Sequence, residues 1–276
     1  MTFARQRLVD DLRRLGLKPG EIVMVHASLR AIGPVYGGPD EVHLAVAEAA
    51  APDGTVVAYV GTPAGADDVG RGFYSAEGEA ELVQFQPPFD SRTARASRDF
   101  GALAEFFRSY KGTVCSNTAC ARTAARGPRA PWLLADQGWS WGFGKGSPFE
   151  KLCAAGGSVL LLGSSHDEVT LLHYAEAIAD FPDKRIVRFQ VPVLQDGKRS
   201  WIACEEFETS ERNIHANWPE DFFGRIVNDF IVRFSRTDAC SVGEVGNAYS
   251  VRMDAAALVA HAVPLMQRRS AGEDVP

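Results

Sequence analysis

The residues best suited to chemistry lie between residues 164 and 176, directly after an apolar run. His166 and His173 are seven residues apart, which is about two turns of a helix and can place both on one face. Thr170 and Glu176 flank His173 at three residues on either side. A histidine changes charge near neutral pH, so it can take the proton of an incoming amine. The segment is a candidate general-base site, and the alternative is a His173 packed as a polar residue beside the core.

A metal site is the rival interpretation of this segment. Its candidate ligands are His166, Asp167, His173 and Glu176. Zinc sites have three or four ligands at recognised spacings, and a metalloprotease helix reads H-E-x-x-H. Six residues separate the two histidines here, so we expect no metal. A His/Asp metal-dependent hydrolase stays open as an alternative function.

Two groups of carboxylates are candidates to serve such a site. At the end of an expected hairpin, strand alternation puts Glu206 and Glu208 on one face. One of them would hold and polarise a histidine, and the alternative is a solvated edge. Asp67 and Asp68 lie in an acidic segment without periodicity. Such a segment is usually a solvated loop, but with a polycationic ligand it would be a recognition surface.

A third group follows the first expected strand. Residues 25–30 offer the Ser28 hydroxyl, the Arg30 guanidinium and turn amides at the carboxyl end of that strand. Hydroxyls, guanidinium groups and turn amides are good anion ligands. The segment contains neither a Walker loop nor a G-x-G-x-x-G fingerprint. It therefore indicates an anion site of no known nucleotide-binding type.

The elements that position these residues alternate between strands and helices. Residues 22–25, 40–50 and 55–60 predict a strand, a helix and a second strand, which is a β-α-β unit with parallel strands. We also expect a buried strand at 158–162, an antiparallel hairpin at 186–194 and 200–207, and helices at 101–110, 148–155, 166–180, 222–234 and 253–266. A Ser165–Glu168 capping box is expected to open the helix at 166. Residues 61–98 lack periodicity and predict an irregular substrate loop.

This order predicts an α/β fold, with a mixed sheet of β-α-β units flanked by helices and an antiparallel hairpin portion. A single domain is expected over residues 1–276. The net charge of −6 argues against nucleic acid and suits a cationic small molecule. The five cysteines form no C-x-x-C motif, and no apolar run approaches the length of a membrane span. We therefore expect a cytoplasmic protein with no membrane partner, and the oligomeric state stays open.

Four segments resemble the aminoglycoside 3-N-acetyltransferase family, also called the antibiotic N-acetyltransferases. They are VMVHASLRAIGPVYGGPDEV near the N-terminus, GKGSPFEKL at 144–152, SVLLLGSSHDEVTLLHYAE at 158–176 and VGEVGNAYSVRMDAAALV at 242–259. The resemblance implies acetyl transfer from acetyl-coenzyme A to an aminoglycoside, at the 3-amino group of the deoxystreptamine ring, giving antibiotic resistance. It also implies an α/β fold that is not Gcn5-type. Acetylation of another small amine and a catalytically silent binder are the alternatives.

The resemblance also implies roles for single residues. His173 matches the family's catalytic base and Glu206 its supporting carboxylate. The coenzyme A-binding positions would be Ser28, Leu29, Arg30, Lys145 and Ser147. Apart from the resemblance, we expect the substrate to be bound by Asp67, Asp68, His166, Asp167, Glu176 and Glu208. Where the family commonly reads Ser-x-His-Pro, this chain has residues 116–119 as Ser-Asn-Thr-Ala, a departure expected to bear on the acceptor range.

Overall fold

The strands form one large mixed sheet and one separate hairpin. The computed structural model describes residues 1–182, 184–208 and 218–276. The large sheet has seven strands in the order β3-β4-β2-β1-β5-β9-β8. They are β1 (Ile22–Ala27), β2 (Thr55–Tyr59), β3 (Val114–Cys115), β4 (Thr123–Arg126), β5 (Ser158–Leu162), β8 (Cys240–Val245) and β9 (Ala248–Asp254). The hairpin consists of β6 (Ile186–Gln195) and β7 (Lys198–Phe207).

The centre of the large sheet is parallel and its edges are antiparallel. β1 pairs in parallel with β2 on one side and with β5 on the other. β4 and β9 then add antiparallel strands next to β2 and β5. The expected β-α-β unit, the mixed sheet and the antiparallel hairpin are all confirmed. The carboxyl ends of β1, β2 and β5 consequently meet at one edge, where ligands bind in open α/β sheets.

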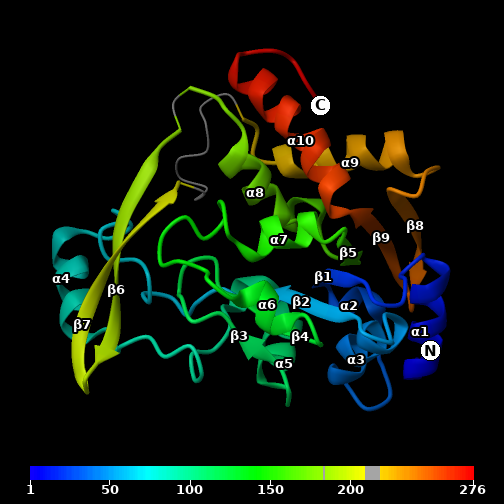
Figure 1. Cartoon of the computed structure of the whole chain (residues 1–276), viewed down its shortest axis with the longest axis horizontal. Coiled ribbons are helices and arrows are strands. Elements are labelled where there is room, and N and C mark those ends of the chain that lie inside the picture. Colours follow the sequence, from blue (N-terminus) through cyan, green and yellow to red (C-terminus); the bar gives the residue numbers. More distant parts are fainter. Residues whose placement is uncertain (183, 209–217) are drawn as a thin grey trace.

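Helices cover both faces of this sheet (Figure 1). The helices of the described part of the chain are α1 (Arg5–Arg14), α2 (Leu29–Ile32), α3 (Asp40–Ala49), α4 (Ala76–Phe85), α5 (Gly101–Ser109), α6 (Ala130–Leu134), α7 (Pro148–Ala154), α8 (Leu171–Ile178), α9 (Phe222–Phe234) and α10 (Ala255–Ser270). Side chains of β1 alternate between the two layers, because Met24 packs with α7 to α10 and Val25 packs with α1, α3 and α5. A strand buried on both faces explains the continuous apolar run in its sequence.

The expected helix over residues 166–180 is wrong in its first turn. The structure has a 3₁₀ turn at His166–Glu168 and then a separate helix, α8, that begins at Leu171. Val169 is fully buried and has a ψ of 88°, which breaks the helical path. Ser165 caps the short turn by accepting from the Asp167 amide, so the capping box does not form. The two histidines consequently do not share one helical face.

Other boundaries also differ from the expectations. Met253 lies in β9, where it pairs with Val159 of β5, so the last helix begins at Ala255 and not at 253. The irregular segment 61–98 contains α4, which Ser75 caps by accepting from the Gly78 amide. The first difference results from strand pairing and the second from a helix cap. The local hydrophobic pattern shows neither.

Segment 61–98 packs along the hairpin. The Gln190 amide of β6 donates to the Val69 carbonyl at 2.8 Å, and the Phe89 amide donates to the Pro192 carbonyl at 2.6 Å. Arg199 of β7 donates to the carbonyls of Gln84 and Gln86. Figure 1 accordingly shows α4 beside β6 and β7, away from the large sheet. The hairpin is therefore the support on which the loop rests.

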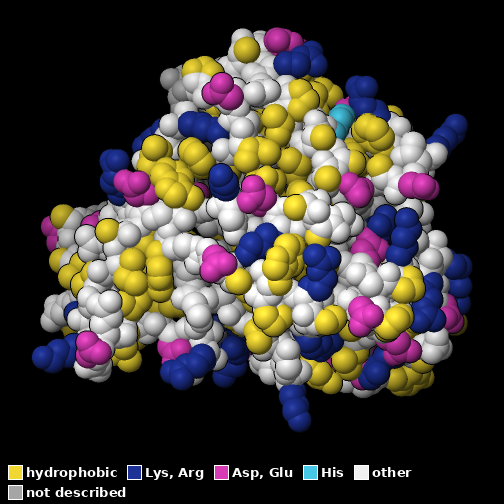
Figure 2. Space-filling view, viewed as in Figure 1, with side chains coloured by type: hydrophobic (Ala, Val, Ile, Leu, Met, Phe, Trp, Pro, Cys, Tyr) yellow, Lys and Arg dark blue, Asp and Glu magenta, His cyan; other side chains and the backbone are white. Residues whose placement is uncertain are grey.

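In the described part of the chain no helix is both long enough and apolar enough to cross a membrane. Figure 2 shows basic and acidic side chains interspersed on one face of the molecule, without a continuous basic patch on that face.

Candidate active site

A cavity of about 640 Å³ opens at the carboxyl edge of the large sheet. Its walls include the ends of β1 and β2, the residues that follow β5, part of α8 and the start of α9. Residues 98–101, which lead from the irregular segment into the start of α5, line another side of the cavity. This volume lies in the range of small-molecule sites, roughly 300–1,000 Å³.

His173 projects into this cavity from the first turn of α8. Its Nδ1 lies 2.9 Å from Oε2 of Glu176, three residues further along the same helix. Successive helical turns place such residues side by side. The His173 side chain is 27% exposed and that of Glu176 is 7% exposed. Nδ1 is therefore engaged by a buried carboxylate, and Nε2 is the ring nitrogen that can receive a proton.

Aromatic rings fix the orientation of the same imidazole. The ring centroids of Phe143 and Phe223 each lie 5.0 Å from that of His173. Phe143 comes from the loop before α7, and Phe223 comes from the second residue of α9. Contacts on two sides hold the ring in place while a substrate approaches, which is how supporting residues preorganise a catalytic group.

Glu206, expected to support His173, has other partners in the structure. Its Oε2 accepts from the Phe143 amide at 3.3 Å and its Oε1 accepts from the Phe207 amide at 3.0 Å. Burial raises the pKa of Glu206, although these amide bonds favour its charged form. Glu206 thus ties β7 to the loop that carries Phe143, and Glu176 takes the place next to the imidazole. The expected pairing of Glu206 with His173 is corrected on this geometry.

Carboxylates dominate the polar lining of the cavity. Among the described lining residues, the acidic ones are Asp99, Asp167, Glu168, Glu176, Glu208 and Glu220. Arg98 is the single lysine or arginine in that set. Glu208 follows directly after β7 and is 6% exposed. A cavity whose described lining has six carboxylates and one guanidinium favours a ligand with several positive charges.

Asp167 lines the cavity, whereas His166 does not. Asp167 Oδ1 accepts from the Gly224 amide at 2.7 Å, at the beginning of α9. His166 Nδ1 lies 2.7 Å from Asn228 Oδ1, outside the cavity lining. The break at Val169 turns the two histidines toward different partners. The structure therefore separates His166 from the site around His173.

Asp67 and Asp68, expected to bind substrate, are engaged by their own loop. Asp67 accepts from the Thr62 hydroxyl at 2.9 Å and from Arg71 Nη2 at 2.9 Å. Asp68 accepts from the Gly65 amide at 3.0 Å, and burial raises the pKa of Asp67. Neither carboxylate is among the residues lining the cavity. These local bonds shape the irregular loop and leave the acidic lining to other residues.

The coenzyme A positions inferred from the resemblance are dispersed. Ser28 lines the cavity; its amide donates to the Leu162 carbonyl at 2.9 Å and its hydroxyl caps α2. Leu29 and the exposed Arg30 follow on α2, outside the cavity lining.

Lys145 is exposed, and Ser147 is 2% exposed with its hydroxyl accepting from the Glu150 amide as the cap of α7. Neither residue lines the cavity. The Ser147 hydroxyl thus has a structural role at the start of α7, and its contact with the coenzyme stays a prediction.

Several lining residues escaped the sequence analysis as site residues. His26 is the penultimate residue of β1; its Nε2 is buried without a hydrogen-bond partner, and burial lowers its pKa to about 4. Tyr59 ends β2, and its ring lies 4.5 Å from that of Phe100. Their positions at strand ends were the available signal, since His26 stands in the segment already considered as an anion site. Phe100 gave no local signal, because a long-range contact brings it to the cavity.

The described residues contain no group of three or more histidine, cysteine, aspartate or glutamate side chains arranged to hold a metal ion. In segment 164–176 no such group forms because His166 and His173 turn toward different partners. The donor set considered for a metal-dependent hydrolase does not converge.

Comparison with known proteins gives consistent results. Residues 24–267 match the family model of aminoglycoside 3-N-acetyltransferase. An aminoglycoside N(3)-acetyltransferase III of Pseudomonas aeruginosa is 35% identical over 265 residues, covering 95% of this chain and 93% of that protein. The solved structure of AAC-IIIb in a binary complex with CoASH superimposes with a TM-score of 0.88 at 38% identity, covering 98% of both chains. AAC-VIa bound to sisomicin gives a TM-score of 0.86 at 34% identity, covering 98% of this chain and 99% of that one.

Proposed function

The chain belongs to the aminoglycoside 3-N-acetyltransferase family, and from this premise we propose that it transfers the acetyl group of acetyl-coenzyme A to the 3-amino group of an aminoglycoside. The observation that carries the proposal is the His173–Glu176 pair in the wall of a cavity whose described lining residues include six carboxylates. Acetylation removes a positive charge from the antibiotic, and we infer that it confers resistance. Strands from both halves of the chain join one sheet, which supports a single domain over residues 1–276.

The acceptor determines what the protein must do. A thioester is already activated, whereas an amine is protonated at neutral pH and cannot attack. In our proposal the bound ammonium first gives one proton to solvent, and His173 Nε2 takes a second proton from the amine as the nitrogen attacks the acetyl carbonyl, a role worth typically 10²–10⁴-fold. The new carbon–nitrogen bond forms and the carbon–sulfur bond breaks. The proton held by His173 then passes to the departing thiolate, so that coenzyme A leaves as a thiol.

Glu176 stabilises the imidazolium that this step creates. Its carboxylate lies 2.9 Å from Nδ1, so it keeps Nδ1 protonated and Nε2 ready to accept. The lining carboxylates bind the remaining ammonium groups of the acceptor. For the co-substrate we propose the end of β1, where Ser28 lines the cavity and Arg30 follows two residues later on α2.

A single assay tests the proposed function. Release of free thiol from acetyl-coenzyme A is measured with an aminoglycoside, with the same aminoglycoside already acetylated on its 3-amino group, with a linear polyamine and without an amine. We expect release with the unmodified aminoglycoside alone. Equal release without an amine would indicate a hydrolase, and equal release with the polyamine would indicate acetylation of another small amine.

A further inference from the structure

Arg122 is a buried cation outside the cavity that the proposed mechanism does not use. Arg122 is 0% exposed, and it is the largest of the fully buried side chains. It directly precedes β4, and burial lowers its pKa. A buried guanidinium needs a strong set of acceptors to offset its loss of water. The question is which part of the molecule supplies them.

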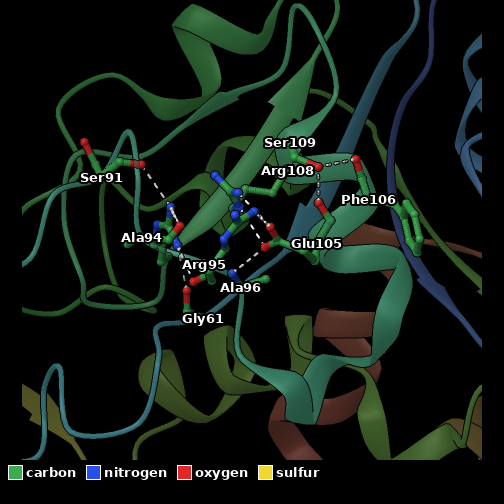
Figure 3. A network of polar contacts seen from close by, with 10 residues as sticks. Gly61, Ser91, Ala94, Arg95, Ala96, Glu105, Phe106, Arg108 and Ser109 are labelled. Atoms are coloured by element: carbon green, nitrogen blue, oxygen red, sulfur yellow. Dashed lines mark hydrogen bonds and ion pairs between the residues drawn. The ribbon is translucent and has the colours of Figure 1, made fainter.

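Backbone carbonyls of the substrate loop fill this role. Arg122 Nη1 donates to the carbonyls of Gly61 at 3.3 Å and Arg95 at 3.0 Å. Nη2 donates to the carbonyls of Ser91 and Ala94, both at 2.9 Å. Figure 3 labels the four acceptor residues, Gly61, Ser91, Ala94 and Arg95, within one network of polar contacts. A planar fork bridging four carbonyls is a geometry that a lysine ammonium does not reproduce.

Glu105 of α5 holds the same stretch from the other side. Its carboxylate accepts from the Ala96 amide at 2.8 Å and from Arg95 Nη1 at 2.6 Å. Arg108 Nη2 completes the group at 2.7 Å from Glu105 (Figure 3). Segment 91–97 is therefore fixed between β4 and α5 by charged groups on both sides.

The next three residues form a wall of the cavity. Arg98, Asp99 and Phe100 all line it. The Ser97 amide donates to the Val60 carbonyl at 2.8 Å, and the Ser97 hydroxyl donates to Asp99 Oδ2 at 2.8 Å. The position of the Asp99 carboxylate consequently depends on where the segment before it is anchored.

On the basis of the proposed function, we propose that Arg122 is a positioning residue for acceptor recognition. It anchors segment 91–95 and thereby holds Asp99 and Phe100 in the wall of the cavity that His173 also lines. Arg122 has no contact with the cavity itself. Its loss should weaken acceptor binding and leave the base and the co-substrate site in place.

The test compares Arg122→Met and Arg122→Lys with a matched control, Arg126→Met. Arg126 lies four residues further along the chain, in β4, and its guanidinium faces the ring of Tyr110 at 4.8 Å instead of the loop. Because several charge-assisted bonds are lost together, we expect Arg122→Met to raise the acceptor KM about tenfold or more. The acetyl-coenzyme A KM should change less than about twofold in either variant. Arg122→Lys, which keeps a charge and is the safer variant for folding, should raise the acceptor KM in the same direction.

Limited proteolysis examines the anchor without any substrate. Trypsin cleaves after Arg92, Arg95 and Arg98, all within or next to the anchored segment. Cleavage at these sites should become faster in both Arg122 variants and stay at the wild-type rate in Arg126→Met.

The two readouts separate the failure of this inference from the failure of the proposed function. If the wild-type protein releases no thiol with an aminoglycoside, the proposed function fails and the cleavage rates still decide whether Arg122 anchors the loop. If the wild-type protein is active and both Arg122 variants retain its acceptor KM, the positioning role is wrong. Equal effects of Arg122→Met and Arg126→Met on acceptor KM would also overturn it, because they would reflect general destabilisation.

Discussion

Replacing Glu176 by glutamine removes a charge next to His173 and keeps the shape of the side chain. The Nδ1–Oε2 distance is 2.9 Å, so 332/(20 × 2.9) gives an attraction of about 6 kcal/mol between imidazolium and carboxylate at an effective dielectric constant of 20. The His173 side chain is 27% exposed, and solvent screening reduces this value. A neutral hydrogen bond also survives in the variant. We therefore expect a loss of ~3 kcal/mol, or about two orders of magnitude in rate.

This loss should appear in kcat, because the imidazolium exists only as the amine proton is transferred. Thiol release is measured over a range of acceptor concentrations for Glu176→Gln and for Glu206→Gln. We expect kcat to fall about 100-fold in Glu176→Gln and less than about fivefold in Glu206→Gln, because Glu206 contacts backbone amides. Thermal unfolding of both variants controls for folding. A larger fall in Glu206→Gln than in Glu176→Gln would refute the assignment of the supporting carboxylate.

Three further predictions concern residues around the site. His26 has its pKa lowered from 6.5 to about 4, so between these values the unfolded chain binds a proton that the folded protein excludes. His26 should therefore cost the wild type about 2 kcal/mol of unfolding free energy between pH 7 and about pH 5. This loss should be absent from His26→Gln, as measured by denaturant unfolding at the two pH values. Asp99→Asn should raise the acceptor KM by a few-fold at low ionic strength, whereas a joint Asp67→Asn and Asp68→Asn variant should keep the wild-type salt dependence; the reverse pattern would restore the acidic loop as the recognition surface. Ser147→Ala should lower the unfolding free energy by about 1 kcal/mol through loss of the α7 cap and leave the acetyl-coenzyme A KM unchanged; a raised KM with unchanged stability would place Ser147 at the coenzyme.

The core of the fold was predictable because its signals are local. Residues 22–25 form a continuous apolar run, which is the pattern of a strand buried between two helical layers. Further along the chain, Pro39 marks the start of the helix that follows this strand. The turn at Asp196 and Gly197 has positive φ at both residues, 51° and 76°, as a two-residue hairpin requires. The break at Val169 was not predictable, since an apolar residue at that position continues the helical period. Its extended conformation results from burial against the core.

The site was predictable in part. His173 follows from its position after a strand end and from the resemblance, and the three-residue spacing of Glu176 was visible in the sequence. Its role as partner was missed because the resemblance assigned support to Glu206. That choice depends on how β7 packs against the loop at Phe143, which is a long-range contact. The same holds for Asp99, whose place in the cavity depends on Arg122 and its distant carbonyl partners.

The central claim is acetyl transfer to the 3-amino group with His173 as the base. It is tested most directly by incubating the wild type and His173→Ala with sisomicin and acetyl-coenzyme A labelled with ¹³C in the acetyl carbonyl, and by locating the label in the product by NMR. We predict one labelled amide on the 3-amino nitrogen for each thiol released by the wild type, and a kcat for His173→Ala reduced at least about 100-fold with coenzyme A binding retained. Label on another nitrogen or in free acetate, or a His173→Ala variant that keeps more than about a tenth of the wild-type kcat, would contradict the account.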